Sequence, residues 1–436
     1  MDRRLIAVAF ASTASMVIMG SGAARAESTL GAPFPDENVR ERSEQQTQQQ
    51  RETVTTRPRP EYDALGVRYE GFYFYPKWTQ SEVFDDNIFA VPGAGKSDLI
   101  SVFSPAFQIR SDFNQHAVSF GGRADLGRYM ISPDENYDDW AFFSDGRIDI
   151  TRSAGLVGAS TFARRHEDRG SPDAVDGKHP TEFYAFSPSI GAYWQLNRIS
   201  LRTEAGLTRY DYEDVTTATG QVIDQDDRDR VEYLGGARIG YEIVPSYEAF
   251  FRGTYNQRVY QQTVDNDGFQ RDSHGFELDV GTALDLTGVL FGNIFGGWRE
   301  QYYKETQFST VRGPSFGADL TWNVTRLTTA KALVTRRTEE TTTVGSSGYN
   351  SMNFGASVDH ELLRNVILSA SGSYQINDYD GSDRDDKLIR AAAGGKYLIN
   401  RYASVGLAYN FVNRKSNAEG ADFTINQVLL TLDLQM

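Results

Sequence analysis

The residues of this sequence that could do chemistry are charged side chains placed at every second position of otherwise apolar segments. Arg123 and Asp125, for example, alternate with Ala124 and Leu126. Side chains alternate between the two faces of a strand, so this pattern puts the charges on one face and the apolar groups on the other. We predict that the charged face lines a water-filled lumen. The predicted lumen-facing charges are Arg123, Arg147, Arg202, Arg228, Arg230, Arg238, Arg252, Arg258, Arg390, Lys396, Asp125, Asp149, Glu204, Glu232 and Glu242.

These opposed charges have two readings, which can hold together. In an open pore, walls of acid and base would set an electric field that biases which solutes pass. Alternatively, the charges pair across neighbouring strands and brace the wall. In both readings the charged face points away from lipid, because a charge on the lipid face costs about 2–4 kcal/mol at mid-bilayer.

Other motifs of this sequence carry weaker signals. Ala90–Ser97 reads A-V-P-G-A-G-K-S, close to a phosphate-binding loop, but it lacks the first Gly and precedes a strand pattern instead of a helix. Acidic clusters at Asp85–Asn87, Asp224–Asp229, Asp265–Gly268 and Asp378–Asp386 could bind Ca²⁺ or Mg²⁺. None has the full spacing of a calcium loop, so we interpret all five segments as solvated outer loops.

Composition excludes several classes of function. Cys is absent, which removes thiol, disulfide and thiolate-metal chemistry. The five His residues lack metal-ligand spacing, and no Ser, His and acidic triad can be picked out. The net charge of -15 argues against binding nucleic acid through its phosphates. We therefore expect no enzyme, cofactor, metal site or nucleic-acid partner.

The last ten residues, Gln427–Met436, show the element that must carry the charges. They read Q-V-L-L-T-L-D-L-Q-M, with one apolar face and one nearly polar face. A dyad pattern over about ten residues is typical of a transmembrane β-strand. Similar segments recur from Gly71 onward. Val289–Gln301 is apolar on both faces, so its lumen-facing side cannot be assigned from the sequence. A soluble β-sandwich is the competing interpretation.

Connections of two lengths alternate along these segments. Short connections are expected at Ser111–Gln115, Arg152–Gly155, Asn197–Arg198, Val244–Ser246, Asp285–Gly288, Asn323–Arg326, Leu363–Asn365 and Asn400–Arg401. Long polar connections are expected at Phe84–Ser97, Ile131–Asp138, Glu167–Pro180, Glu213–Asp226, Gln261–Arg271, Tyr303–Ser309, Glu339–Gly348, Asp378–Arg384 and Arg414–Gly420. Brief periplasmic turns and longer outer loops are the bacterial outer-membrane arrangement.

The pattern predicts an all-β fold over residues 67–436, a closed antiparallel up-and-down transmembrane β-barrel of about 18 strands with both termini in the periplasm. Closure is required because lipid cannot satisfy the backbone groups of a free sheet edge. Barrels of this size leave an aqueous channel unless a loop or plug fills it. Phe84–Ser97 and Glu167–Pro180 are long enough to fold inward and narrow the pore.

The N-terminal region differs from the body of the chain. Residues 1–26 are predicted to be a signal peptide, with Arg3 and Arg4 before an apolar run, and Ala24-Arg25-Ala26 as a cleavage site. Residues 27–66 are polar and repetitive, and we predict a disordered periplasmic tail. Export and the barrel pattern together predict the outer membrane of a Gram-negative cell, among lipid and lipopolysaccharide.

A set of short motifs resembles the β-barrel porin type 2 family from about Arg57 to the C-terminus. The motifs are R-P-R-P-E-Y-D-A-L-G (Arg57–Gly66), F-D-D-N-I-F-A (Phe84–Ala90), K-S-D-L-I-S-V-F-S-P (Lys96–Pro105), R-S-D-F-N-Q-H (Arg110–His116), D-I-T-R (Asp149–Arg152) and R-H-E-D-R-G-S-P (Arg165–Pro172). The family consists of outer-membrane β-barrels often found with exopolysaccharide or capsule synthesis genes. It has no established catalytic residues to carry over.

The resemblance implies a porin-like channel for small hydrophilic solutes or oligosaccharides. The alternative is a non-conducting structural or accessory component of exopolysaccharide or capsule secretion. The barrel assembly machinery is an expected partner, and polysaccharide secretion components are a further one. This chain departs from the usual barrel pattern at its last residue, where Met436 replaces the aromatic residue that commonly serves as an assembly signal.

Overall fold

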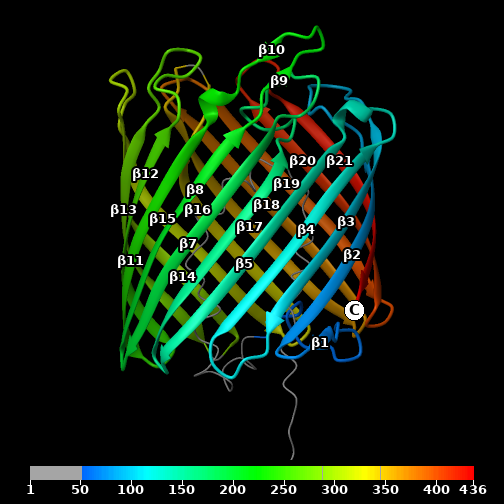
Figure 1. Cartoon of the computed structure of the whole chain (residues 1–436), viewed down its shortest axis with the longest axis vertical. Helices are drawn as coiled ribbons and strands as arrows, with labels where there is room; N and C mark the ends of the chain where they lie inside the picture. The colour runs from blue at the N-terminus through cyan, green and yellow to red at the C-terminus, as the bar shows by residue number, and fades with distance from the viewer. Residues whose placement is uncertain (1–51, 287, 344) are drawn as a thin grey trace, which may run out of the picture.

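The computed structural model describes residues 52–286, 288–343 and 345–436 (Figure 1). The predicted signal peptide, 1–26, and residues 27–51 of the predicted tail lie outside the described residues. In the described part, 18 strands form a closed antiparallel β-barrel, so the predicted fold class is confirmed. No helix in this part has the length and hydropathy to span a bilayer.

The barrel strands are 12 to 16 residues long. Their bounds are β2 (Phe72–Asp85), β3 (Asp98–Ser111), β4 (Ala117–Tyr129), β5 (Tyr137–Thr151), β6 (Ala154–His166), β7 (Glu182–Leu196), β8 (Ile199–Tyr212), β11 (Arg230–Val244), β12 (Tyr247–Tyr260), β13 (Ser273–Leu286), β14 (Leu290–Tyr303), β15 (Val311–Thr325), β16 (Thr328–Glu339), β17 (Gly348–Leu363), β18 (Val366–Asp380), β19 (Asp385–Leu398), β20 (Ala403–Ser416) and β21 (Phe423–Gln435). The short strand β1 (Val67–Tyr69) pairs with the start of β2. The other short elements lie in connections between barrel strands: β9 (Val215–Thr216), β10 (Val222–Ile223), and the 3₁₀ turns η3 (Pro133–Glu135) and η4 (Asp226–Arg228).

Each barrel strand pairs with the next barrel strand along the chain, and the last strand returns to the first. β9 and β10 pair only with each other, within the connection from β8 to β11. β21 closes the barrel on β2, with Leu434 opposite Trp78. The wall therefore has no free edge strand, which is the condition for a sheet in lipid.

The two ends of the barrel differ as the sequence predicts (Figure 1). Short turns lie at the end that carries the C-terminus and β1, and the long loops lie at the opposite end. Asn197 and Ser246 have positive φ values of 50° and 76° in two of the short turns. Positive φ is the backbone conformation that tight hairpin turns need. We name the short-turn end the inner end and the long-loop end the outer end.

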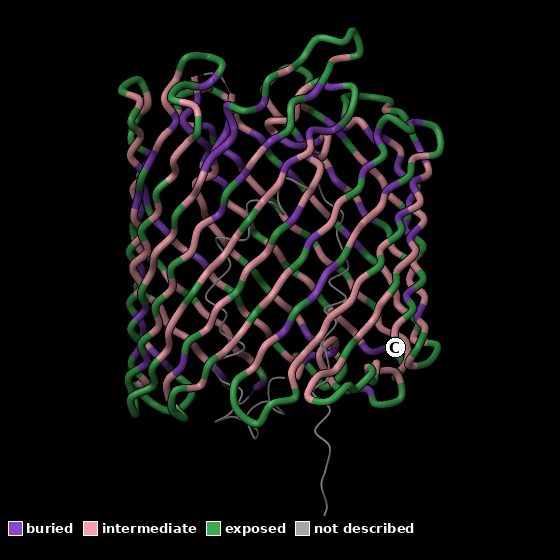
Figure 2. Tube along the Cα trace, viewed as in Figure 1, coloured by how far each residue is buried: buried purple, intermediate pink, exposed green. Residues whose placement is uncertain are grey.

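Exposure alternates along the barrel strands, which Figure 2 shows as changing colour on each strand. On β12, for example, the side chains of Phe251 and Tyr255 are 47% and 51% exposed, while Phe250 between Ala249 and Phe251 is buried. Large apolar groups are normally buried, so a whole surface of exposed ones is suited to a hydrocarbon environment. The outer surface of the wall is therefore apolar.

Residues 52–66, the last part of the predicted tail, lie against the inner end of the barrel, and we name them the inner-mouth segment. The backbone N–H of Val54 donates to Thr329 Oγ1 on β16 at 3.0 Å. At its other end, Gln435 of β21 donates to the carbonyl oxygen of Tyr62 at 3.1 Å. The segment thus connects distant parts of the wall at the inner end. Its order comes from backbone hydrogen bonds and a buried ion pair, which its polar composition did not reveal.

Candidate functional site: a charged lumen and two narrowed mouths

The interior face of the wall is identified by contacts that join non-neighbouring strands. Arg258 on β12 forms an ion pair with Glu340, which directly follows β16. Such a contact crosses three intervening strands and must pass through the interior of the barrel. Glu232 on β11 lies directly opposite Arg258 in the strand register and so shares this face. The charged face is therefore the lumen side of these strands.

A row of arginines crosses three neighbouring strands on this face. Arg238 on β11 lies opposite Arg202 on β8 and opposite Arg252 on β12. Like charges in directly opposite positions destabilise a sheet, so the row needs acidic partners. Glu248 lies 2.7 Å from Arg238, and Asp279 lies 2.6 Å from Arg252.

Aromatic rings support the same guanidinium groups. The guanidinium carbon of Arg238 lies 3.9 Å from the centre of the Phe250 ring. That of Arg252 lies 4.2 Å from the centre of the Phe295 ring. A cation over an aromatic face gains electrostatic attraction and is fixed in orientation. Arg238 and Arg252 are thus both paired with acidic groups and held against aromatic rings.

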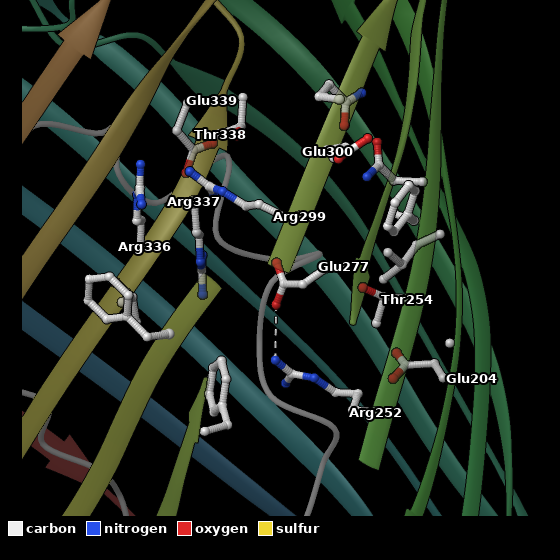
Figure 3. Close-up of a pocket in the computed structure, with 18 of the residues that line it drawn as sticks. Glu204, Arg252, Thr254, Glu277, Arg299, Glu300, Arg336, Arg337, Thr338 and Glu339 are labelled. Carbon is white, nitrogen blue, oxygen red and sulfur yellow. Dashed lines mark hydrogen bonds and ion pairs between the residues drawn. The ribbon is translucent and has the colours of Figure 1, made fainter. Parts of the chain in front are cut away.

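A cavity of about 490 Å³ lies in the lumen against β8 and β11–β16 (Figure 3). Six of the predicted lumen-facing charges line it: Glu204, Arg230, Glu232, Arg238, Arg252 and Arg258. Residues not predicted from sequence line it as well, including Glu277, Arg299, Arg336, Arg337 and Glu339. Figure 3 shows Arg299, Arg336 and Arg337 gathered on one side, with Glu277 bonded to Arg252 below them.

Sequence reasoning missed Arg299 because it lies in a segment that is apolar on both faces. The sequence of Val289–Gln301 therefore did not show which of its side chains face the lumen. The available signal was the register: Arg299 lies opposite Glu277 on β13, one strand from the predicted charge Arg252. Pairing by register would have extended the lumen face to β14.

Other predicted lumen charges lie away from this cavity and have their own partners. Arg147 lies 2.9 Å from Asp149, and Arg123 lies 4.0 Å from Asp125. Lys396 on β19 lies 2.8 Å from Asp433. The predicted charges that complete the set are Arg390, which donates to Gln375 at 2.8 Å, and Glu242, which lies opposite Glu248 near the inner end.

The placement of Arg228 on a lumen-facing strand is wrong. Arg228 lies in η4, in the outer connection before β11, and forms a buried ion pair with Glu167 at 2.7 Å. Burial acts to raise the pKa of the Glu167 carboxyl, but the Arg228 guanidinium outweighs it and holds that pKa below its usual value. The alternating charges of Asp226–Arg230 imitate a strand pattern, although the strand begins only at Arg230.

The outer mouth is crossed by residues 167–181, which we name the outer-mouth loop. It connects β6 to β7 and contains Glu167–Pro180, one of the two loops predicted to be long enough to fold inward. Arg169 binds Glu135 at 2.7 Å, and Arg414 of β20 donates to the carbonyl oxygen of Gly170 at 2.9 Å. On another side, Asp173 accepts a hydrogen bond from Thr341 at 2.6 Å. The loop is therefore held from several parts of the rim.

In the described part of the chain, two residues of the predicted cluster Asp224–Asp229 join Asp214, which was not predicted, in a group of three close carboxylates. Asp214, Asp224 and Asp226 place one oxygen each within 4.8 Å of one another, and all three residues are exposed. Exposed acidic residues in a loop commonly gather without an ion. This group is consistent with the solvated outer loops expected from sequence.

The fold and its polar, charged interior define a barrel of the porin class. A family model described as "Putative beta-barrel porin 2" matches residues 59–436, and the chain belongs to this family. The resemblance drawn from the short motifs is thereby confirmed. Among curated proteins, none matches the chain.

Several solved structures are similar to this chain. Pseudomonas aeruginosa OccK3 (OpdO) is 14% identical, with 84% of this chain and 96% of that chain covered and a TM-score of 0.44. Pseudomonas aeruginosa OpdK with vanillate is 11% identical, with 83% and 99% covered and a TM-score of 0.46. Acinetobacter baumannii OccAB4 is 9% identical, with 83% and 98% covered and a TM-score of 0.44. Family and fold point to a channel and not to an enzyme.

Proposed function

We propose that this protein is a porin-like channel of the Gram-negative outer membrane that lets small hydrophilic solutes or oligosaccharides pass. The observation that carries the proposal is the closed 18-strand wall with a charged interior and a lumen cavity of about 490 Å³. A barrel of 16–18 strands has room for an aqueous path. Charged walls keep such a path wet and bias which solutes enter it.

The segments at both mouths set the expected behaviour of this channel. The inner-mouth segment is attached to β16 and β21, and the outer-mouth loop is attached to η3, β20 and the loop after β16. A polypeptide segment that crosses a mouth of the barrel reduces the width of that mouth. We therefore propose a narrow, size-selective path instead of a wide general pore.

The same two segments favour a second candidate function. A barrel obstructed at both ends would serve as a non-conducting structural or accessory component of exopolysaccharide or capsule secretion. Its interior ion pairs would then brace the wall, as Arg238–Glu248 and Arg252–Asp279 do by geometry. The two functions differ in one property, the passage of solute through the folded barrel.

Swelling of proteoliposomes separates the two functions. Vesicles containing the folded protein are diluted into isotonic sugars of increasing size, from a pentose to a trisaccharide, with protein-free vesicles as the control. The channel function predicts swelling in the smallest sugars that declines with size. Folded protein that gives the protein-free rate with every sugar would favour the accessory function.

A further inference from the structure

Arg299 on β14 is a buried arginine that lacks the close acidic partner that Arg238 and Arg252 have. Its side chain lines the lumen cavity, and the residue is 6% exposed. The guanidinium donates to the amide oxygen of Asn350, and in the described part of the chain no carboxylate oxygen lies within 4.0 Å of it. By contrast, the buried Arg228 and Arg238 each have a carboxylate at 2.7 Å.

A second guanidinium lies next to this position. Gly313 on β15 is directly opposite Arg299 in the register, and a Cβ added to Gly313 would lie 3.4 Å from Nη2 of Arg336. Arg336 donates to the carbonyl oxygen of Pro314 at 2.9 Å and likewise has no carboxylate within 4.0 Å among the described residues. Figure 3 shows both side chains at the same cavity.

The local backbone explains why Arg336 reaches the lumen. The ladder between β15 and β16 extends from the inner turn to the pair Gly317 and Thr335 and goes no further. Beyond that pair, Arg336 has a pairing partner only on β17, where it lies opposite Met352, and none on β15. Gly313, which has no side chain, leaves the space that the guanidinium occupies.

Two neighbouring cations with no close counter-ion repel each other and lose solvation on burial. The carboxylates of Glu277, Glu339 and Asp380 contribute to the field at Arg299, but each lies beyond 4.0 Å. An oxyanion placed between the two guanidinium groups would satisfy both, because a guanidinium fork matches the oxygens of carboxylate and phosphate. The cavity of about 490 Å³ has the volume of a site for a small molecule.

We propose that Arg299 and Arg336 form a binding site for the oxyanion, carboxylate or phosphate, of a small solute such as an acidic sugar. Its role in solute selection rests on the proposed channel function, whereas binding itself does not. A channel with this site passes anionic sugars in preference to neutral sugars of the same size. Neighbouring groups Arg337 and Thr338 lie at the edge of the same cavity.

Isothermal titration calorimetry of the folded barrel in detergent tests the site with three probes: glucuronate, glucose 6-phosphate and glucose. The proposal predicts that one or both anions bind and that glucose binds at least about tenfold more weakly, the scale of a charge-assisted hydrogen bond. Binding of only one anion identifies its oxyanion as the ligand. Equal affinity for all three probes overturns the proposal.

Variants locate the binding. Arg299→Gln and Arg336→Gln should each weaken anion binding about tenfold or more. Arg299→Lys, which keeps the charge but loses the fork, should bind with intermediate affinity. The matched control is Arg312→Gln, at an exposed position on the same strand as Gly313, and it should bind as the wild type does. Wild-type affinity in both Gln variants overturns the proposal.

The readouts separate this inference from the channel function. A heat-dependent shift in gel mobility shows which variants are folded, and if Arg299→Gln does not fold, the half-buried Arg336→Gln decides. A folded barrel that binds glucuronate but gives no solute passage would contradict the channel function and retain the site. A conducting barrel that does not discriminate among the three probes would contradict the site and retain the channel function.

Discussion

At the scale of single residues, the interior depends on buried ion pairs whose partners come from distant parts of the chain. The carboxylate of Glu361 on β17 accepts a hydrogen bond from the guanidinium of Arg59 at 2.8 Å. Glu361 is 6% exposed and Arg59 is 4% exposed. Removing one member of a buried pair leaves the other charge uncompensated, which commonly costs about 3–5 kcal/mol. A cost of this size is large enough for the pair to keep the inner-mouth segment bound to the wall.

Glu361→Gln should release that segment. Without the carboxylate, Arg59 remains a buried cation, and the segment gains solvation by leaving the wall. Hydrogen–deuterium exchange of peptides covering 52–66 should be at least about tenfold faster than in the wild type, as a loss above 1.4 kcal/mol implies. The control is Glu70→Gln, at an exposed position. Unchanged exchange in Glu361→Gln would show that the pair does not hold the segment.

Asp229 should make the outer connection before β11, residues 213–229, sensitive to pH. It accepts the backbone N–H of Tyr212 at 2.7 Å, and burial raises the pKa of its carboxyl to about 6. Because this folded-state pKa exceeds the unfolded value, its contribution to stability is full below about pH 4 and is lost as the pH rises through 6. Exchange in 213–229, corrected for the intrinsic rate, should be slower at pH 4.5 than at pH 7. Asp229→Asn should lose this difference, and a variant that kept it would assign the effect to other groups.

At the scale of elements, glycines allow neighbouring strands to approach. A Cβ added to Gly297 on β14 would lie 1.9 Å from the carbonyl oxygen of Leu278 on β13, so any side chain there forces the backbone apart. At the adjacent Gly296, the nearest atom would be 3.8 Å away, which is an ordinary contact. Adjacent residues of one strand thus differ sharply in tolerance.

Gly297→Ala should destabilise the barrel, and Gly296→Ala should not. We expect Gly297→Ala to lower the free energy of unfolding by about 1–3 kcal/mol, the usual cost of overpacking. Urea unfolding of the protein in lipid vesicles, followed by tryptophan fluorescence, measures both variants. Equal midpoints for the two would contradict the close approach of β13 and β14.

The outer-mouth loop should control the width of the outer opening. Asp173 accepts hydrogen bonds from Oγ1 of Thr341 at 2.6 Å and from the N–H of Thr342 at 3.1 Å. Asp173→Ala removes these bonds and a third from Oγ1 of Thr342 at 3.4 Å, so the loop should move more freely and solute passage should increase. Swelling rates with a trisaccharide should rise relative to the wild type, while Asp176→Ala, at an exposed position, should leave them unchanged. Equal rates in the two variants would show that this contact does not restrict passage.

At the scale of the whole molecule, the sequence predicts the wall better than it predicts what lies inside it. Strand alternation and turn length depend on local residue types, so the barrel and its two kinds of connection followed directly from them. The pairing of Arg59 with Glu361 joins residues 302 positions apart and leaves no local signal. The inward position of Arg336 depends on where the ladder between β15 and β16 ends, which no pattern within β16 reveals.

The central claim is that hydrophilic solutes cross the membrane through the interior of this barrel. Single-channel recording in planar bilayers tests it most directly, with the chain from Glu27 folded and checked by gel mobility. We predict stable, reproducible conductance steps that decrease when glucuronate is added. Folded barrels that insert into the bilayer and give no steps at any voltage below the breakdown of the membrane would contradict the claim.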